Sequence, residues 1–296
     1  MSKEKRKNHD LNQSSFYRLS TKRKLAALLS ISQNELREFK YSDRLYSERE
    51  IPKKTGGVRL IENPRRNLKL TQARIARLLG RISPPEYLYC PVRGRSYVTN
   101  AARHMNRRVI RTLDIKKYFP STSRDRVYRF FRDVMKCSPD IAEMLANIAT
   151  YKGHLPTGSP LSPIMAFYAH YDVWEEVARL AETKGAIISL YIDDLTISGD
   201  QVSDGLIWEI KKSIHRAGLR YHKEKSFFDT PAEITGVIVC EDRLAIPNRQ
   251  LLKRHRAAKA LQKASTDYER KLLLTQLRGL DGQAHQIRSA DRQEQQ

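Results

Sequence analysis

Residues 187–198 read IISLYIDDLTIS, an apolar run that is interrupted at its centre by two adjacent acidic residues. β-branched and aromatic residues on both sides favour extended strands, and the polar pair between them favours a tight turn. The segment therefore predicts an antiparallel strand pair that carries Asp193 and Asp194 at its turn. Two neighbouring carboxylates repel each other unless a cation is present, so this hairpin indicates a cation site, although so short a string also arises by chance.

A third acidic residue, Asp114, follows an apolar stretch in a second candidate strand, VIRTLDI at residues 109–115. If the two strands are neighbours, the three carboxylates converge. Nucleotide polymerisation is a phosphoryl transfer in which two Mg²⁺ ions, about 3.5–4 Å apart, neutralise the attacking and leaving oxygens and are held by carboxylates. The three aspartates therefore predict a two-metal centre, with Mn²⁺ as an alternative ion. Taken alone, Asp114 is as readily a turn or capping residue.

The charge balance points to a polyanionic partner. Lys and Arg number 55 against 33 Asp and Glu, a net charge of +22, and the basic residues recur along the whole chain. Such a surplus favours phosphate contacts through counterion release, so we predict a nucleic-acid partner, with an anionic membrane surface as the rival. The 3 cysteines form no CxxC pair, which indicates neither a disulfide framework nor a zinc knuckle.

The pattern of apolar residues predicts a mixed fold without a membrane span. No apolar run approaches the roughly 20 residues that a spanning helix needs, and the basic start lacks the apolar stretch of a signal peptide, so we expect a cytoplasmic protein with no membrane partner. Helices and strands alternate without strict βαβ regularity, which predicts an α+β fold. Helices are expected at residues 25–32, 67–83, 124–131, 139–151, 163–181, from 199 to 217 and from 248 onward, and strands on both sides of Gly56-Gly57, at 219–228 and at 234–239.

At the three acids the sequence resembles the reverse transcriptases, which are RNA-directed DNA polymerases. YIDDL at 191–195 is similar to their YxDD metal-binding turn, and LDIKKYFPS at 113–121 is similar to the strand that supplies the other metal-binding aspartate. LPTGSPLSP at 155–163 is similar to their LPQGxPxSP segment. IPKKTGGVRLIENP at 51–64 resembles the fingers hairpin that holds the triphosphate, and GLRYHKEKSFF at 218–228 resembles the segment with a lysine near the leaving pyrophosphate.

Two further segments narrow the resemblance to the bacterial retron type. NAARH at 100–104 is similar to the retron NAxxH element, and ITGVIV at 234–239 is similar to the retron VTG element with Ile in place of Val. The resemblance covers roughly residues 48–250. Thr157 stands where the family usually has Gln, so the family does not imply how this position contacts substrate or template.

The resemblance implies a right-hand polymerase with fingers, a palm made of an antiparallel sheet and helices, and a small helical thumb. The expected divisions are 1–45 as an N-terminal helical extension, 46–113 as part of the fingers, 114–240 as the palm with inserted fingers helices, and 241–296 as the thumb.

The resemblance also implies roles for residues around the metal centre. Asp114 and Asp193 would bind both ions, Asp194 would complete the site, and the backbone carbonyl of Ile115 would be a further ligand. Phe119 would act as the steric gate that excludes a ribose 2′-OH, the alternative being a core aromatic residue. The remaining nucleotide-binding candidates are Arg59, Arg95, Thr157, Gly158 and Lys225. Each of these five residues has an ordinary structural or surface role as the alternative.

Other residues are candidates for nucleic-acid contacts. Asn100 is expected as a helix N-cap or RNA contact, and His104 as an RNA contact or a packed side chain. Basic residues near the C-terminus are expected to line a face of the duplex or of a structured RNA, mainly by reading phosphates and shape. The full set is Lys53, Lys54, Asn100, His104, Tyr191, Lys253, Arg254 and Arg256, with Lys259 beside them.

A retron-type enzyme would copy part of its own structured noncoding RNA into DNA, priming from a 2′-OH within that RNA and giving a branched RNA–DNA product. The implied partners are this RNA and its DNA product, dNTPs, and an effector protein of an anti-phage defence system. Two alternatives stay open: a stand-alone defence reverse transcriptase, and a basic RNA-binding protein whose catalytic site has lapsed.

Overall fold

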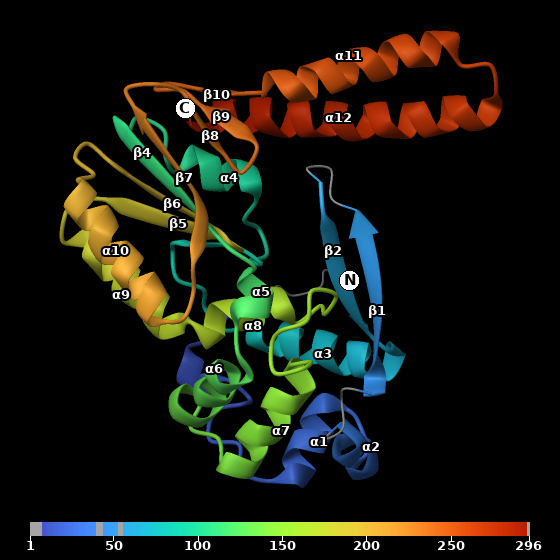
Figure 1. Cartoon of the computed structure of the whole chain (residues 1–296), viewed down its shortest axis with the longest axis vertical. Helices are drawn as coiled ribbons and strands as arrows, with labels where there is room; N and C mark the ends of the chain where they lie inside the picture. The colour runs from blue at the N-terminus through green and yellow to red at the C-terminus, as the bar shows by residue number, and fades with distance from the viewer. Residues whose placement is uncertain (1–7, 40–43, 53–55, 295–296) are drawn as a thin grey trace, which may run out of the picture. The chain divides into compact units, whose positions relative to one another are not determined.

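A computed structural model describes residues 8–39, 44–52 and 56–294 of the chain (Figure 1). The chain divides into two compact units. Unit 1 comprises Met1–Glu86, Ile115–Arg179 and Trp208–His222, and unit 2 comprises Tyr87–Asp114, Leu180–Ile207 and Lys223–Gln296. Both contain helices together with antiparallel strands, which confirms the predicted α+β class.

Unit 2 is built on a five-stranded sheet in the order β3-β5-β6-β4-β7. The strands β5 and β6 form the predicted hairpin, β4 pairs antiparallel with β6, and β3 pairs parallel with β5. Successive residues of β6, such as Leu195, Thr196 and Ile197, are all buried, so both faces of the sheet are packed at this central strand. The strands are β3 (Leu88–Cys90), β4 (Val109–Ile115), β5 (Ile187–Tyr191), β6 (Asp194–Gly199) and β7 (Tyr221–Phe228).

A second, three-stranded sheet in unit 2 corrects one sequence-based prediction. Residues 234–239 were expected to form one strand, but they belong to β8 (Ala232–Ile234) and β9 (Val237–Val239), which pair as a hairpin. The turn residues Thr235 and Gly236 have φ angles of 46° and 86°. Positive φ at both central positions is the geometry of a two-residue type I′ turn, so this short apolar segment folds back on itself.

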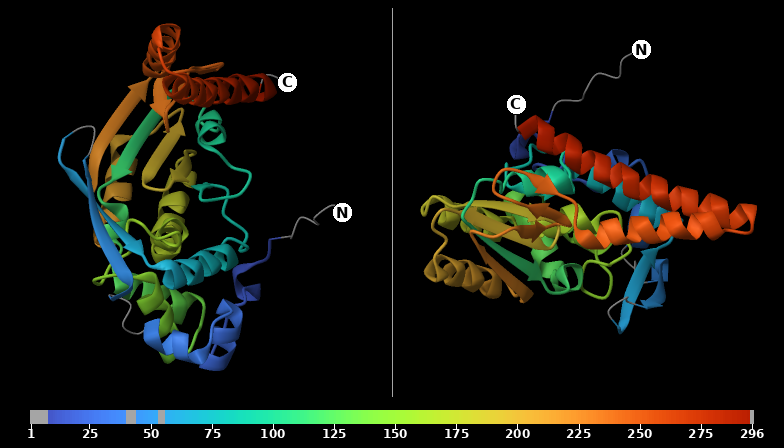
Figure 2. Two further views of the ribbon diagram at one scale, coloured as in Figure 1. Left: turned by 90° about the vertical axis from the view of Figure 1, so that its right-hand side faces the viewer. Right: turned by 90° about the horizontal axis from the view of Figure 1, so that it is seen from above.

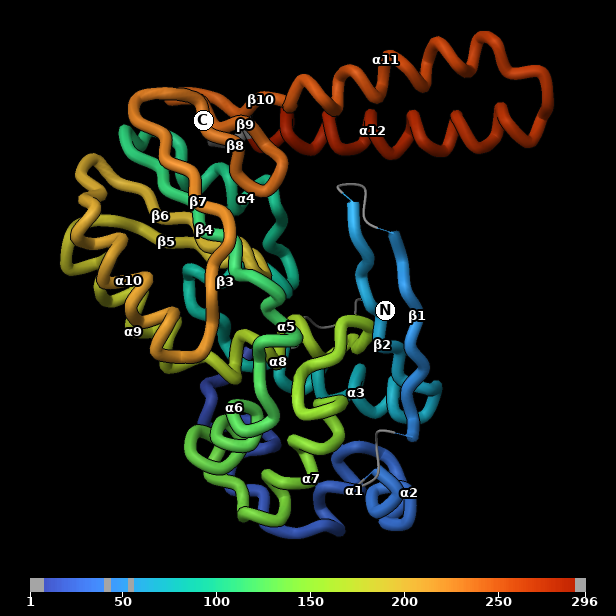
Figure 3. The backbone as a smooth tube through the Cα atoms, in the orientation of Figure 1, coloured from blue at the N-terminus to red at the C-terminus, as the bar shows by residue number. Residues whose placement is uncertain are grey.

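The C-terminal helices of unit 2, α11 (Asn248–Lys263) and α12 (Asp267–Glu294), lie side by side as a helical hairpin in all three views (Figures 1 to 3). The last part of α12 packs on α4 (Tyr97–Ala102) and on β10 (Leu244–Ala245). Ile287 of α12 is fully buried in the apolar cluster that fills this junction. Most residues of α11 are exposed, so this helix is held mainly by its packing against α12.

Unit 1 combines a helical core with a separate β-hairpin. The hairpin pairs β1 (Tyr46–Pro52) with β2 (Val58–Pro64) in register from Tyr46↔Pro64 to Pro52↔Val58. The core is sealed by side chains such as Phe16, Phe131 and Trp174, which are 0% exposed. The helices are α1 (Lys22–Leu29), α2 (Gln33–Glu38), α3 (Arg66–Leu79), α5 (Tyr118–Ser121), α6 (Arg124–Arg129), α7 (Pro139–Ala149) and α8 (Ser162–Ala169), and α9 (Tyr171–Glu182) and α10 (Asp204–Arg216) contribute residues to both units.

The helix predicted at 163–181 is instead two helices, α8 and α9, which meet at His170. The backbone of His170 leaves helical geometry, with φ −117° and ψ 25°, and its buried ring contacts the Thr122 hydroxyl at 3.3 Å. Burial lowers the pKa of His170 to about 3.

No helix within the described ranges is long and apolar enough to cross a membrane. The 3 cysteines are free thiols.

Candidate active site

The acidic hairpin of unit 2 has the predicted strand–turn–strand geometry. Tyr191 of β5 pairs with Asp194 of β6, so Ile192 and Asp193 form the two-residue turn between them. Ile192 has a φ of 58°, a left-handed conformation that costs an L-residue roughly 1–2 kcal/mol and is least favourable for a β-branched one. The turn is therefore strained at the residue that precedes the two acids.

The third acid lies directly across the sheet from this turn. Asp114 of β4 is the cross-strand partner of Asp194, and paired residues of this kind have Cβ atoms about 4.5–5.5 Å apart. The prediction that the two acidic strands are neighbours is confirmed. Burial, followed by repulsion from Asp193 and then Asp114, raises the pKa of Asp194 to about 6, and Lys223 and Lys225 partly offset this rise.

Asp114 and Asp194 line a pocket of about 390 Å³ that lies wholly within unit 2. Lys225, a predicted site residue, lines it, and so does Lys223, which the sequence reasoning missed. The Lys223 ammonium lies 4.0 Å from the Asp114 carboxylate. The sequence could have predicted Lys223 as a site residue, because alternate residues of a strand share a face and Lys223 stands two positions before Lys225. The lining residues are Thr112, Asp114, Tyr191, Asp194, Thr196, Lys223, Lys225, Glu233, Ile234, Thr235, Gly236 and Arg249.

The donor set of this pocket suits a hard divalent cation. Repulsion among the clustered carboxylates contributes to the raised pKa of Asp194, and a cation bound between them would offset this repulsion. Mg²⁺ prefers oxygen ligands of this kind. In the part of the chain that the structure describes, however, no three His, Cys, Asp or Glu side chains are already arranged as ligands of one ion. The fit therefore rests on the chemistry and placement of Asp114 and Asp194.

The two retron-like segments contact each other at Thr235, which lines this pocket. The Asn100 amide donates to the Thr235 hydroxyl at 3.4 Å, and that hydroxyl donates to the Tyr97 carbonyl at 2.9 Å. The helix α4 that carries Asn100 is capped by Ser96, which accepts from the Thr99 amide, so the prediction of Asn100 as N-cap is wrong. Asn100 lies inside α4 because Ser96 and Thr99, which come earlier, already accept hydrogen bonds from the backbone amides at the start of the helix.

His104 is a packed side chain that joins two strands. Its ring nitrogens lie 2.7 Å from the hydroxyls of Ser198 on β6 and Ser189 on β5. Burial, assisted by Arg103 and Arg107, lowers the pKa of His104 to about 3. Both Asn100 and His104 are 0% exposed, so the predicted RNA contacts of these two side chains are wrong.

Other predicted residues belong to unit 1, whereas the acidic pocket belongs to unit 2. Phe119 is half-buried, with its ring 6.1 Å from that of Tyr118. Arg59 is exposed on β2, and Lys53 and Lys54 lie outside the described residues. Gly158 lies close to the backbone of β2: a Cβ there would lie 2.6 Å from the Glu62 carbonyl oxygen.

The remaining basic candidates belong to unit 2. Arg95 donates to the Leu88 carbonyl and lies over the Tyr89 ring, 5.5 Å from its centroid. The predicted basic helix is α11, on which Lys253, Arg254, Arg256 and Lys259 are exposed. Arg254 pairs with Asp281 of α12 at 2.5 Å. That these residues contact nucleic acid stays a prediction.

Comparison with known proteins identifies the class to which this fold and acidic pocket belong. Residues 51–239 match the family model of the reverse transcriptases, described as RNA-dependent DNA polymerases, and this range contains all three aspartates. The chain therefore belongs to the reverse transcriptase family.

Curated relatives confirm the predicted resemblance to the retron type. The chain is 32% identical over 148 residues to the retron Se72 reverse transcriptase of Salmonella heidelberg (strain 579083-10), covering 48% of this chain and 38% of the relative. It is 31% identical over 233 residues to the retron Mx65 reverse transcriptase of Myxococcus xanthus, covering 70% and 52%. Against the retron Ec86 reverse transcriptase of Escherichia coli, identity is 27% over 230 residues, covering 74% and 69%. The chain thus spans from about a third to about two thirds of the length of these relatives.

Proposed function

We propose that this chain is an RNA-directed DNA polymerase of retron type, which copies part of a structured noncoding RNA into DNA and gives a branched RNA–DNA product (msDNA). One observation carries the proposal: Asp114 and Asp194 are cross-strand partners beside the Asp193 turn, inside the range that matches the reverse transcriptases. The retron reverse transcriptases among its relatives support the retron type.

Asp114, Asp193 and Asp194, with the backbone carbonyl of Ile115, would hold two Mg²⁺ ions or their Mn²⁺ equivalents. When bound, such ions neutralise charge on the attacking and leaving oxygens of phosphoryl transfer. Lys223 and Lys225 bring positive charge to the same pocket, where they would attract the triphosphate of a dNTP. A protonated Lys225 would donate a proton to the departing pyrophosphate, and β7 holds it at the pocket wall.

We further propose the right-hand assignment for the rest of the chain. Residues 46–113 would form part of the fingers, 114–240 the palm with inserted fingers helices, and 241–296 the thumb, behind an N-terminal extension at 1–45. Arg59 and Arg95 would contact the triphosphate and Phe119 would exclude ribonucleotides. The exposed basic residues of α11 would bind phosphates of the RNA or of the RNA–DNA duplex. An effector protein of an anti-phage system would be a further partner.

Mg²⁺-dependent DNA synthesis by the purified chain tests the activity. The substrate is either the noncoding RNA encoded next to the gene for this chain or an RNA template with a DNA primer. On one or both substrates we expect dNTP incorporation that EDTA abolishes. Binding of RNA without incorporation on either substrate would favour the catalytically lapsed RNA-binding protein instead.

Sequencing the nucleic acid that co-purifies with the chain separates the two polymerase alternatives. A branched RNA–DNA species supports the retron type. Unbranched DNA with no attached RNA would contradict it and favour a stand-alone defence reverse transcriptase.

A further inference from the structure

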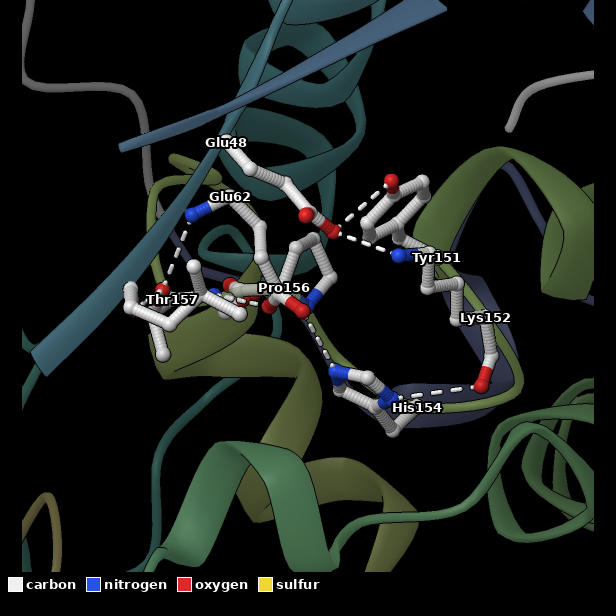
Figure 4. Close-up of polar contacts among 9 residues, drawn as sticks. Glu48, Glu62, Tyr151, Lys152, His154, Pro156 and Thr157 are labelled. Atoms are coloured by element: carbon white, nitrogen blue, oxygen red, sulfur yellow. Dashed lines mark hydrogen bonds and ion pairs between the residues drawn. The ribbon is translucent and has the colours of Figure 1, made fainter. Parts of the chain in front are cut away.

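The loop at residues 151–159 covers the outer edge of strand β2 in unit 1 (Figure 4). The Thr157 hydroxyl donates to the Leu60 carbonyl at 2.8 Å and accepts from the Glu62 amide at 3.2 Å. The Gly158 amide donates to the Glu62 carbonyl at 3.1 Å. An edge strand normally leaves such groups to water or to another chain, so this loop takes the place of a third strand.

A buried carboxylate reinforces the same contact. Glu62 is 3% exposed, and its side chain accepts from His154 Nε2 at 2.9 Å and from the Thr157 amide at 3.2 Å (Figure 4). A buried carboxylate is costly unless it is paired and hydrogen-bonded, so Glu62 keeps its place only while the loop stays docked. The second ring nitrogen of His154 lies 3.2 Å from the Lys152 carbonyl, which fixes the ring.

The partner strand β1 is tied to the start of the same loop. Glu48 accepts from the Tyr151 hydroxyl at 3.0 Å and from the Lys152 ammonium at 2.6 Å. The Tyr46 ring stacks on the Tyr151 ring with centroids 4.4 Å apart. Both strands of the hairpin are therefore held by one loop.

The loop is in turn fixed to the helical core of unit 1. The Leu155 amide donates to the Thr122 carbonyl at 3.1 Å, and the hydroxyl of Ser162 on α8 donates to the Pro156 carbonyl at 2.6 Å. The Ser159 hydroxyl donates to Gln72 of α3 at 2.7 Å. The contacts form a continuous path from the core through the loop to the hairpin.

We propose that Thr157, Glu62 and His154 form a latch that positions hairpin β1–β2 for the incoming nucleotide, and that the Thr157 hydroxyl acts through the hairpin and not on the substrate. The inference rests on the proposed polymerase function. Arg59, the candidate triphosphate ligand, immediately precedes the latched residue Leu60, so its placement follows that of the latch. A Gln at position 157 carries a methylene group where Thr157 has its hydroxyl, and its amide lies farther from the backbone than the hydroxyl that bridges Leu60 and Glu62.

Four single variants of the full chain test the latch. Thr157→Val keeps the shape but removes the hydroxyl, Thr157→Ser keeps the hydroxyl, and Thr157→Gln restores the residue usual in the family. Ser47→Ala is the matched control, because it removes a hydroxyl of the same hairpin whose hydrogen bond, to the Asn63 carbonyl, is long at 3.4 Å. Hydrogen exchange at the Glu62 amide is measured without substrate, and kcat and KM for dNTP are measured in Mg²⁺.

Losing one hydrogen bond should speed exchange of the Glu62 amide roughly five- to tenfold in Thr157→Val and Thr157→Gln. We expect the dNTP KM to rise by a similar factor in both, with kcat within about twofold of wild type. Thr157→Ser and Ser47→Ala should match wild type in exchange and KM.

Unchanged exchange in Thr157→Val would overturn the latch. Faster exchange with an unchanged KM, or a wild-type KM in Thr157→Gln, would overturn its role in placing the nucleotide. Absence of DNA synthesis by the wild-type chain would instead contradict the proposed function, while the exchange rates, which need no activity, would still decide the latch.

Discussion

Substitution of His104 by Gln should change how the stability of the protein depends on pH. The imidazole is 0% exposed and bridges Ser189 and Ser198, two hydroxyls that are themselves 0% exposed. Its pKa falls from 6.5 to about 3 on folding because the charged form is buried away from water. The folded state therefore favours the neutral ring, and its stabilising contribution is complete above pH 6.5 and is lost as the pH falls from 6.5 towards 3.

The magnitude follows from these two pKa values. At pH 7.5 both states carry a neutral ring, whereas at pH 5.5 only the unfolded state takes up the proton. The difference amounts to about 1.4 kcal/mol of unfolding free energy for this one residue. A glutamine does not titrate, so its variant should lack this loss. At pH 7.5 the variant should be less stable by about 1–3 kcal/mol, because the buried serine hydroxyls lose well-placed partners.

Urea unfolding of both proteins at pH 7.5 and pH 5.5 measures the effect, and His255→Gln, at an exposed position on α11, serves as the control. We expect the destabilisation caused by His104→Gln to shrink by about 1.4 kcal/mol between the two pH values. An equal destabilisation at both would refute the reasoning, because His104 would then titrate alike in the folded and unfolded states.

Three further predictions follow from the geometry of the loop and the pocket. Gly158→Ala should destabilise the protein by about 1–3 kcal/mol in urea, since its Cβ would overlap a β2 carbonyl, whereas Gly279→Ala, with open space around it, should not. Lys223→Gln should raise the dNTP KM roughly three- to tenfold in a steady-state assay, and an unchanged KM would exclude Lys223 from triphosphate binding. Asn100→Ala and Thr235→Val should be non-additive by about 0.5–1 kcal/mol in a double-mutant cycle, and strict additivity would show that the two retron-like segments are not coupled.

The central features of the pocket could be predicted because they are local. Apolar, β-branched runs on both sides of Asp193 and Asp194 define a hairpin within one short segment, and Asp114 follows the same kind of run. The sequence could not predict that β4 pairs with β6, because strand pairing depends on contacts between residues far apart in the sequence. The convergence of the three acids was therefore predicted only on the condition that the two strands are neighbours.

The predictions failed where a turn or a contact left little trace in composition. Thr235 and Gly236 split an apolar stretch that reads as one strand, because a type I′ turn needs only two residues. The cap of α4 is an exception, because Ser96 is a preferred N-cap residue and stands in the sequence four positions before the predicted Asn100. The burial of His104 between two serines arises from tertiary packing, which no local pattern encodes.

RNA-templated DNA synthesis by Asp194→Asn, compared with the wild-type chain, is the most direct test of the proposed active site. Asp200→Asn, at an exposed acid just beyond β6, is the matched control. We predict that Asp194→Asn lowers the Mg²⁺-dependent rate by on the order of 100-fold or more, while Asp200→Asn stays near wild type. Synthesis by Asp194→Asn at the wild-type rate would contradict the assignment of the acidic pocket as the catalytic centre.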